Sequence, residues 1–557
     1  MKKITTTILV LSSAILFSQQ LSWQKDIESN TQDFLSGLSV TLDGQYLVSG
    51  SSIQKNQDPT TISGQPSTNK GYDYHILKLD QQGQKVWEKY FSGNRHDYLS
   101  SAVSTREGGF LLAGTSYSSQ AFDKKDQSNG SSDIWVIKIN ENGEEEWQKT
   151  IGTRYSEEAR SVAQTTDEGY IIAGSTNHPT LRQAQGKGYG SKDVLVTKLD
   201  KAGRIVGELI LGGKGLDEVE KVIPTKDGGV LLGIYSRSGT VANEGSRINN
   251  GDASTPLSMT EAQIPTNFYF KTTENHGEGD YWIVKLDKNN KVQWEKNYGG
   301  SEDDHIRTMA LTDSGYIIGG ESRSETSGNK RAKLEEGTDL WVLALDDDGN
   351  EQWQQSYNFK NRDVLMSLNE VKEQREKNKE STTKGFLIGG YTQSEGKTER
   401  NDETFWMLYI DRNGKEVWRK YVEGRDKKKE ERLTSALLNR DGSYILAGTS
   451  AEELGKENWK VVKLEDKQIE DLLENKDIQI YPNPVKDYCY VEIGLDFESA
   501  DIYVYDMTGK VIQTYNTKNR VTKVDTSKLP QGVYIIKANI PTEQNKKLTT
   551  KIVKDFY

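Results

Sequence analysis

Carboxylates recur along this chain at a fixed distance from an apolar segment of the type Gly-Tyr-Ile-Ile-Ala-Gly. An acid lies thirteen residues before the first large residue of that segment in six places. Asp363 fills the same position in a copy that has extra residues. Such a set could bind a metal ion or a glycan, but an acid repeated in every copy more often accepts hydrogen bonds from backbone amides. We therefore predict an architectural role for Asp33, Asp97, Glu157, Asp217, Asp303, Asp363 and Glu431.

Few other residues have types and spacings that suggest chemistry. The single cysteine, Cys489, excludes an intramolecular disulfide, and the five histidines are scattered rather than clustered. Asp303, Asp304 and His305 are neighbours in sequence, but nothing marks them as catalytic. We predict no catalytic residue, no metal and no cofactor. A carbohydrate-active or quinone-dependent enzyme stays as the alternative, and it would need a converging acid pair or a slot for a planar cofactor.

The recurrent acids belong to a longer repeat. Each copy has a Trp strand, a strand that follows the acid and ends in an Asp-Gly turn, an apolar strand, and a strand that begins with Asp. Alternation with period two between Gly, Asp and Asn turns is typical of β-strands. Trp87 and Trp147 are sixty residues apart, and the spacing stays close to sixty between other leading positions where the loops are short. The seven copies begin at Trp23, Trp87, Trp147, Gly207, Trp294, Trp353 and Trp418.

Four short antiparallel strands repeated seven times predict an all-β fold, a seven-bladed β-propeller. We expect the repeated tryptophans to pack one blade against the next. The turn before each Trp strand is short, so that strand should pair with the preceding Asp-led strand. The array begins with a Trp strand at residues 21–26. It ends at residues 459–464 with a strand equivalent to those that begin with Asp in other copies. Pairing these two would complete the last blade and cover both exposed edges.

Two stretches of the repeat resemble known repeats. The phrase Leu-Asp-x-x-Gly followed by a short strand and Trp is similar to the repeat of quinoprotein-type propellers. Gly-Tyr-Ile-Ile-Ala-Gly-Ser, with its preceding turn, resembles uncharacterised repeats of exported bacterial proteins. Both resemblances imply the fold rather than an activity.

The ends of the chain indicate export. Lys2 and Lys3 precede an apolar stretch at residues 4–17, which predicts a signal peptide at 1–18. No later apolar run is long enough for a transmembrane helix. The net charge of -11 argues against a nucleic-acid partner. We expect the propeller at 19–465, a linker at 466–477 and a separate domain at 478–557.

The last eighty residues carry several motifs in order: Ile-Tyr-Pro-Asn-Pro-Val from Ile480, Met-Thr-Gly-Lys from Met507, and Gln-Gly-Val-Tyr from Gln531. They resemble the type A C-terminal sorting domain of the type IX secretion system. The resemblance implies a small β-sandwich that the secretion machinery reads at the outer membrane and removes, after which the propeller is released or fixed to surface lipopolysaccharide. A generic immunoglobulin-like binding module is the alternative. The motif residues are Tyr481, Pro482, Asn483, Pro484, Gly509, Gly532 and Tyr534.

Long connections join the apolar strand to the Asp-led strand in most copies, the longest at residues 236–279. In an up-and-down array they share one face with the recurrent acids, and we predict that binding uses this loop-rich face. Phe268, Tyr269 and Phe270 are the expected aromatic anchors, unless the insert is a spacer. The sequence thus predicts a secreted or cell-surface, outer membrane-associated protein that binds an unknown glycan or protein. A structural component of the cell envelope or of an adhesin layer is the other possibility.

Overall fold

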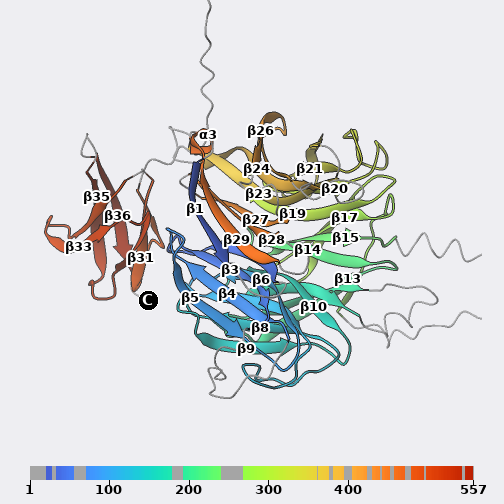
Figure 1. The fold of residues 1–557 in the computed structure, drawn as a ribbon, viewed down its shortest axis with the longest axis horizontal. Helices are drawn as coiled ribbons and strands as arrows, with labels where there is room; N and C mark the ends of the chain where they lie inside the picture. The colour runs from blue at the N-terminus through green and yellow to red at the C-terminus, as the bar shows by residue number, and fades with distance from the viewer. Residues whose placement is uncertain are drawn as a thin grey trace, which may run out of the picture.

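The computed structural model consists almost wholly of β-strands (Figure 1). It describes residues 20–27, 33–54, 71–177, 192–239, 267–359, 362–374, 381–393, 404–422, 430–439, 442–451, 457–470, 478–494, 497–541 and 546–555. The expected signal peptide and residues 240–266 of the long insert lie outside these ranges. Within them the one α-helix is α3 (Lys467–Glu470). None of the described helical segments is long and apolar enough to cross a bilayer.

Seven sheets follow one another along residues 20–465, and we number them in chain order as sheets 1 to 7. Within each sheet we call the strands first to fourth in the order in which they pair. Sheet 3 has a fifth strand, which runs parallel to its neighbour. The first four sheets contain β2 (Phe34–Val40), β3 (Tyr46–Ser52), β4 (Asp73–Leu79), β5 (Lys85–Phe91); β6 (Asp97–Ser104), β7 (Phe110–Ser116), β8 (Asp133–Ile139), β9 (Glu145–Ile151); β10 (Glu157–Gln164), β11 (Tyr170–Thr176), β12 (Asp193–Leu199), β13 (Ile205–Gly212), β16 (Phe268–Phe270); and β14 (Asp217–Pro224), β15 (Val230–Ser236), β17 (Asp280–Leu286), β18 (Val292–Tyr298).

Sheets 5 to 7 have the same plan of four antiparallel strands, the first after the recurrent acid and the fourth carrying the repeated Trp. They contain β19 (Asp304–Thr312), β20 (Gly315–Ser322), β21 (Asp339–Leu345), β22 (Glu351–Tyr357); β23 (Arg362–Gln374), β24 (Ser381–Gln393), β25 (Thr404–Asp411), β26 (Glu416–Val422); and β27 (Glu430–Leu438), β28 (Tyr444–Ala451), β29 (Asn458–Glu465) with β1 (Gln20–Ile27).

The first strand of the array completes its last sheet, as the sequence predicted. β1 pairs antiparallel with β29, with Gln20 opposite Glu465 and Ile27 opposite Trp459. Each first strand also contacts the first strands of the two neighbouring sheets, and β2 contacts β27. The seven first strands are therefore connected in one continuous series that returns to its start.

The hydrophobic core lies between successive sheets. The second and third strands are buried along their whole length in most sheets, as in β7 and β8, because other sheets cover both of their faces. One cluster, for example, joins Ile134 and Val136 of sheet 2 to Tyr170 and Ile172 of sheet 3. In six of the seven sheets a large aromatic residue on the third strand is fully buried. Those side chains that are fully buried are Tyr74, Trp135, Trp282, Trp341, Trp406 and Trp459.

The repeated Trp of the fourth strand covers a turn of the next sheet. Trp23 donates its indole N–H to the carbonyl of Gln81 at 3.1 Å, and Trp87 does the same to Glu141 at 3.1 Å. The turn glycine beneath Trp23 is Gly83, which has φ +77°. A Cβ at Gly83 would lie 2.7 Å from the indole ring. Glycine is therefore required both by the backbone conformation and by the contact.

The one copy without this Trp also lacks the glycine. Gly207 stands in place of Trp, and the turn that faces it in sheet 4 carries Asn290 at φ 64°. The side chain of Asn290 lies 3.9 Å from the position that a Cβ of Gly207 would occupy. Asparagine tolerates a left-handed conformation better than most residues, and its side chain fills part of the space that an indole fills elsewhere.

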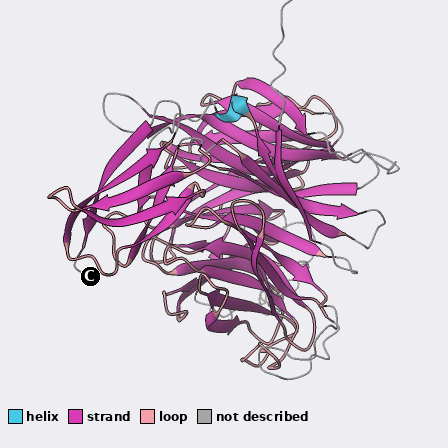
Figure 2. Cartoon of the chain, turned by 60° about the vertical axis from the view of Figure 1, so that its left-hand side comes forward, coloured by secondary structure: helices cyan, strands magenta, loops and turns pink. Residues whose placement is uncertain are grey.

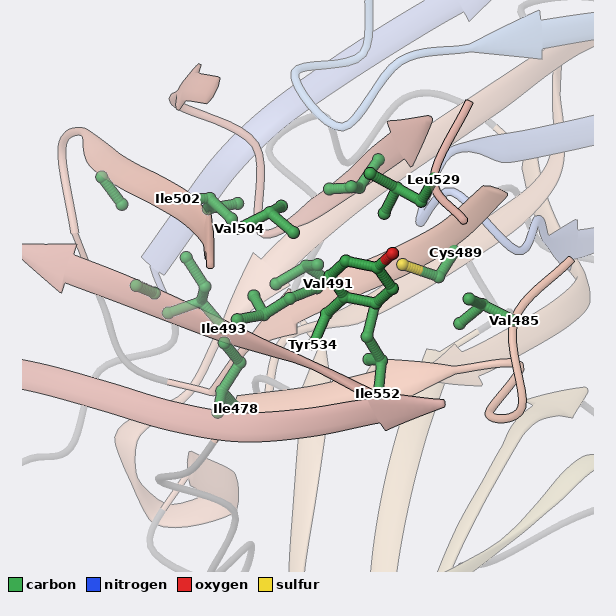
Figure 3. Close-up of a cluster of buried hydrophobic side chains, with 14 of the residues drawn as sticks. Ile478, Val485, Cys489, Val491, Ile493, Ile502, Val504, Leu529, Tyr534 and Ile552 are labelled. Atoms are coloured by element: carbon green, nitrogen blue, oxygen red, sulfur yellow. The ribbon is translucent and has the colours of Figure 1, made fainter. Parts of the chain in front are cut away.

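Residues 478–555, which we call the tail, form two sheets around a core of their own (Figure 3). Val491, Val504 and Ile536 are fully buried in that core, and so is the lone Cys489, whose pKa is raised by burial to about 12. The thiol is therefore uncharged and unreactive at neutral pH. The strands are β30 (Ile478–Tyr481), β31 (Tyr488–Ile493) and β34 (Val521–Asp525) in one sheet, and β33 (Val511–Thr517), β32 (Ala500–Tyr505), β35 (Gly532–Ile540) and β36 (Lys546–Lys554) in the other.

The tail lies against the short turns of sheets 1 and 2 (Figures 1 and 2). Gln81 accepts a hydrogen bond from the backbone of Arg520 at 2.9 Å and donates one to the carbonyl of Val521 at 3.2 Å. Tyr488 donates its hydroxyl to the carbonyl of Glu107 at 2.9 Å, and Lys523 pairs with Glu141. The tail thus covers part of the face formed by the short turns and leaves the face of the long connections uncovered.

Candidate functional site

The recurrent carboxylates lie where the chain enters the first strand of each sheet. Asp97 is fully buried and accepts hydrogen bonds from the backbone N–H of Gly93 and the hydroxyl of Ser118, both at 2.9 Å. Gly93 belongs to the segment that arrives from sheet 1, and Ser118 to the long connection after the second strand. The carboxylate therefore joins two segments that meet on the loop-rich face.

The same arrangement recurs with other residues of the predicted set. Asp217 accepts hydrogen bonds from the amide of Gly213 and the hydroxyl of Ser238, and Asp363 from the amide of Phe359 and the hydroxyl of Thr392. Glu157 and Asp33 are buried at the same position, whereas the side chain of Glu431 is outside the described part of the chain. No group of acidic, His or Cys side chains in the described ranges is placed to hold a metal ion.

In sheet 5 the carboxylate at this position is Asp304, and the prediction of Asp303 was wrong by one residue. Asp304 is buried and accepts hydrogen bonds from the amide of Gly300 at 2.6 Å and the hydroxyl of Ser324 at 2.9 Å. The turn after β19 is one residue shorter than the equivalent turns, because Thr312 pairs directly with Gly315. A count of thirteen across this shorter turn therefore ends one residue too early.

Three residues after each carboxylate, every first strand contains a β-bulge. The register shifts at this place in all seven first strands, for example between Leu99 and Ser101 in β6 and between Val219 and Lys221 in β14. A bulge leaves one residue unpaired and changes the direction of its side chain. The seven bulge residues are Ser36, Ser100, Arg160, Glu220, Arg307, Met366 and Thr434.

All seven bulge residues line one cavity of 540 Å³, which we call the central cavity. It is surrounded by the first strands of all seven sheets, near the ends at which these strands begin. Its remaining wall is partly apolar, with Leu35, Leu99, Val364 and Leu365. The sequence analysis did not single out these residues. The signal that could have found them is the fixed offset from the recurrent carboxylate, at which the residue type varies from copy to copy.

Sheets 3 to 6 make one side of the central cavity charged. Glu220 is only 8% exposed and pairs with Arg160 at 2.6 Å, while His305 Nε2 lies 3.3 Å from its other oxygen. Burial alone would raise the pKa of Glu220, but the hydrogen bonds and charges of His305 and Arg160 lower it to about 2. This carboxylate is therefore ionised at any physiological pH.

A second buried carboxylate lies behind the same wall. Glu321, 6% exposed, pairs with Arg307 at 2.6 Å and with Arg362 at 3.3 Å. The Nε atom of Arg362 is also buried, and it has no acceptor among the described residues. Two arginines thus share one carboxylate, and part of their hydrogen-bonding capacity is unused.

Lys221 lines the central cavity beside the bulge residue Glu220. Its side chain is accessible to solvent because the cavity is open, yet the surrounding walls lower its pKa by desolvation. No described residue forms an ion pair with Lys221. The opposite side of the cavity presents the hydroxyls of Ser36, Ser100 and Thr434 and no acidic residue.

An aromatic cluster lies beside the cavity on the loop-rich face, and we call it the aromatic platform. Phe34, which also lines the cavity, is 41% exposed, and Tyr117 is 39% exposed. The rings of Tyr72 and Tyr98 lie 5.3 Å apart, and both contact Phe34 and His96 at centroid distances of 5.0 to 6.0 Å. Tyr117 meets Tyr98 edge-on at 6.3 Å. These residues come from sheets 1 and 2.

The predicted anchors in the long insert occupy a different environment. Phe268, Tyr269 and Phe270 form β16 at the outer edge of sheet 3, where each is only partly exposed. Phe268 packs against the core between sheets 2 and 3, and Tyr269 against the core between sheets 3 and 4. β16 pairs with β13 and is the strand of sheet 3 farthest from β10, which lines the central cavity. Their surroundings assign them to packing, and the rest of the insert is outside the described residues.

Three of the described connections between the second and third strands contain a buried lysine, and in sheet 4 this lysine is the residue after β16. Lys271 is buried and donates to the hydroxyl of Ser236 at 3.0 Å, and its burial lowers its pKa to about 8. Lys124 and Lys330 occupy the matching places in the connections of sheets 2 and 5, where they donate to carbonyl and hydroxyl oxygens. These buried amines fix the long connections against the body of the array.

The sequence neighbours of the fifth carboxylate have separate roles. Asp303 accepts the hydroxyl of Tyr235 at 2.5 Å and lies 3.6 Å from Arg237. His305 stacks on the ring of Tyr235 at 4.2 Å and approaches Glu220. Asp303, Asp304 and His305 therefore do not converge on a common point.

The motif residues of the tail hold its strands together. Asn483 accepts a hydrogen bond from the amide of Val553 at 3.0 Å and donates to Lys551 at 3.2 Å, which ties the Pro-Asn-Pro segment to β36. Both Pro482 and Pro484 follow cis peptide bonds. Gly509 has a positive φ in the turn before β33, and Gly532, with φ 153°, is the first residue of β35. Tyr534 is buried in the core of the tail and bonds to Pro530, and Tyr481 donates its hydroxyl to Leu42 of sheet 1.

The chain is thus an all-β repeat protein followed by a separate two-sheet module. Residues 479–555 of that module match the family described as Secretion system C-terminal sorting domain. This match supports export by the type IX secretion machinery and a location at the cell surface or outside the cell.

Comparisons of the whole chain give only distant similarity. No curated protein matches it in sequence. Similar solved structures include the polysaccharide lyase Uly1, with 9% identity, a TM-score of 0.40, and coverage of 78% of this chain and 90% of that one. A protein of unknown function from Dyadobacter fermentans has 10% identity, a TM-score of 0.36, and coverage of 69% and 99%. For the parainfluenza virus 5 hemagglutinin-neuraminidase the values are 10%, 0.33, 64% and 87%.

Proposed function

We propose that this protein is a seven-bladed β-propeller, exported by the type IX system, that binds a saccharide at or beyond the outer membrane without catalysing a reaction. The propeller rests on three observations. Seven four-stranded units follow one another, their first strands contact in a continuous series, and β1 supplies the strand that the last sheet lacks. This arrangement leaves no unit with an uncovered face.

The aromatic platform beside the central cavity is the observation that carries the binding role. Exposed aromatic rings next to a concave polar site suit a sugar, because the apolar face of a pyranose stacks on an aromatic ring while its hydroxyls need hydrogen-bonding partners. The platform supplies the rings, and the bulge residues supply hydroxyl, guanidinium and carboxylate groups. Solitary exposed aromatics would need no such explanation, but a cluster of five rings does.

The position of the tail also favours ligand binding on the loop-rich face. Its hydrogen bonds go to the turns around Leu42, Gln81 and Glu107. The platform and the cavity lie at the other end of the first strands. A ligand on the loop-rich face can therefore bind both before and after the tail is removed.

The acids of the cavity support binding rather than glycoside hydrolysis. Glycoside hydrolysis uses one carboxyl group that donates a proton and a second that acts as nucleophile or base. Glu220, with a pKa of about 2, cannot store a proton at neutral pH. Glu321 is buried and engaged by two arginines, so neither carboxylate is free for the reaction.

The test is a glycan array probed with the chain that lacks only the predicted signal peptide. Calorimetry on the glycan that binds most strongly follows. Replacement of one platform ring, Tyr98→Ala, should weaken binding roughly fivefold, since a stacked aromatic contact contributes about 1 kcal/mol. Tyr503→Ala removes an equally half-buried tyrosine from the tail and should leave binding unchanged. Incubation with the bound glycan should yield no shortened products. Absence of any glycan binding, or product formation, would refute the proposal.

A further inference from the structure

The charges of the central cavity do not balance. Its charged side contains four cations, Arg160, Lys221, Arg307 and Arg362. Two carboxylates, Glu220 and Glu321, pair with three of them. Four basic side chains against two carboxylates leave two basic groups in excess on one wall of the cavity.

The excess is located at particular atoms. Lys221 lines the cavity with an exposed side chain and pairs with no described residue. Arg362 uses one nitrogen for Glu321, while its buried Nε has no acceptor in the described part of the structure. Burying a donor without an acceptor costs about 1–3 kcal/mol, and more for a charged group. An exposed lysine without a described partner and an arginine with unused hydrogen-bonding capacity line the same open cavity, which points to an anionic ligand.

The rest of the cavity limits what kind of anion fits. The bulge residues of sheets 1, 2 and 7 are Ser36, Ser100 and Thr434, which present hydroxyls and no charge. Leu35 and Leu99 add apolar surface. A ligand that places an acidic group on one wall and neutral hydroxyls on the other satisfies both sides, whereas a simple inorganic ion would leave the hydroxyl side unused.

We propose that the central cavity selects acidic saccharides, with the carboxylate or sulfate group of the sugar bound by Lys221 and Arg362. This inference rests on the proposed saccharide binding and specifies its ligand. The aromatic platform holds a neighbouring sugar ring, and the acidic ring enters the cavity. Carboxylate and sulfate share the chemistry that the site recognises: planar or tetrahedral oxygens that accept several N–H donors.

The experiment compares matched pairs of sugars that differ only in charge. Trigalacturonate is compared with its methyl ester, and a κ-carrageenan oligosaccharide with its desulfated form, by calorimetry on the mature full-length protein. The acidic member of at least one pair should bind at least tenfold more tightly than its neutral partner. The pair that shows the larger ratio identifies the group as carboxylate or sulfate.

A lysine variant locates the effect. Lys221→Met should abolish the preference for the acidic sugar, with the melting temperature unchanged because Lys221 has no partner to lose. Lys291→Met removes the same charge from an exposed turn on the opposite face and should retain the preference.

The outcomes separate the two proposals. Equal binding of acidic and neutral sugars by the unaltered protein would overturn the acidic selectivity while the saccharide-binding role stands. A preference that survives Lys221→Met would place the anion elsewhere and would also overturn the inference. Failure of every glycan on the array to bind would remove both proposals.

Discussion

At the scale of single residues, the raised pKa of the recurrent carboxylate Asp363 makes the stability of the fold depend on pH. Asp363 is buried, and this burial raises its pKa to about 7, although the amide of Phe359 and the hydroxyl of Thr392 partly oppose the shift. In the unfolded chain its pKa is about 3.9. Between these two values the folded protein holds a proton that the unfolded protein has lost.

This difference predicts how stability changes with pH. As pH rises from 4 to 7 the group reduces the free energy of unfolding by up to about 1.4 kcal/mol per pH unit, and above 7 its contribution is constant. Asp363→Asn should remove this part of the slope, because the amide keeps an acceptor for Phe359 and has no proton to lose. Denaturant unfolding at several pH values measures the slope. The exposed turn variant Asp348→Asn is the control, and a slope that is the same in Asp363→Asn and in the unaltered protein would contradict the assignment.

At the scale of elements, the first and last strands of the array depend on each other. β1 covers the edge of β29, and Trp23 on β1 covers the turn that contains Gly83 in sheet 1. The strand therefore joins sheet 7 to sheet 1 in addition to completing sheet 7. An exposed edge strand is a template for aggregation.

Deletion of residues 20–27 should consequently lower the melting temperature and cause association at micromolar concentration. The uncovered β29 edge would pair with other molecules, and the indole contact of Trp23 would be lost. Thermal melting with light scattering tests both effects. Trp23→Leu, which keeps the strand but removes the indole, should lower the melting temperature without association. A monomeric deletion variant with an unchanged melting curve would show that the strand does not complete the array.

At the scale of the whole molecule, the tail and the array have separate hydrophobic cores and meet at an interface in which hydrogen bonds accompany apolar contacts such as that of Val521 with Gly44. The hydrogen bonds of Gln81, Tyr488 and Lys523 connect them, and no shared apolar cluster does so among the described residues. α3 belongs to the array side, since Ile469 is buried against sheets 6 and 7. The tail is therefore suited to be removed without unfolding the array.

A chain that ends after residue 470 should fold, melt close to the temperature of the full-length array and keep any saccharide binding. In cells it should accumulate in the periplasm, because the signal peptide predicted from the sequence would direct transport only across the inner membrane. Cell fractionation and surface proteolysis locate the protein. Arrival of the truncated chain at the surface would contradict the role of the tail as a sorting signal.

The sequence alone determined the features that depend on local pattern. Period-two alternation and Asp-x-x-Gly turns specified the strands and their hairpin partners, and the phase of the repeat specified that the strand of Trp23 pairs with that of Trp459. The motifs around Pro482 and Gly509 were enough to identify the sorting domain. These features repeat at fixed intervals, and each depends on residues that are close in sequence or recur in each copy.

Only the tertiary structure decided where the chemistry lies. Arg160, Lys221 and Arg362 belong to three different copies, and nothing in the local sequence indicates that all three line one cavity. The platform likewise unites Phe34 with Tyr98 from the next sheet. Even the exchange of Asp303 for Asp304 depended on the length of one turn, because a count along the sequence does not register pairing across strands. Convergence requires all seven first strands to meet, and that is a property of the assembled array rather than of any repeat.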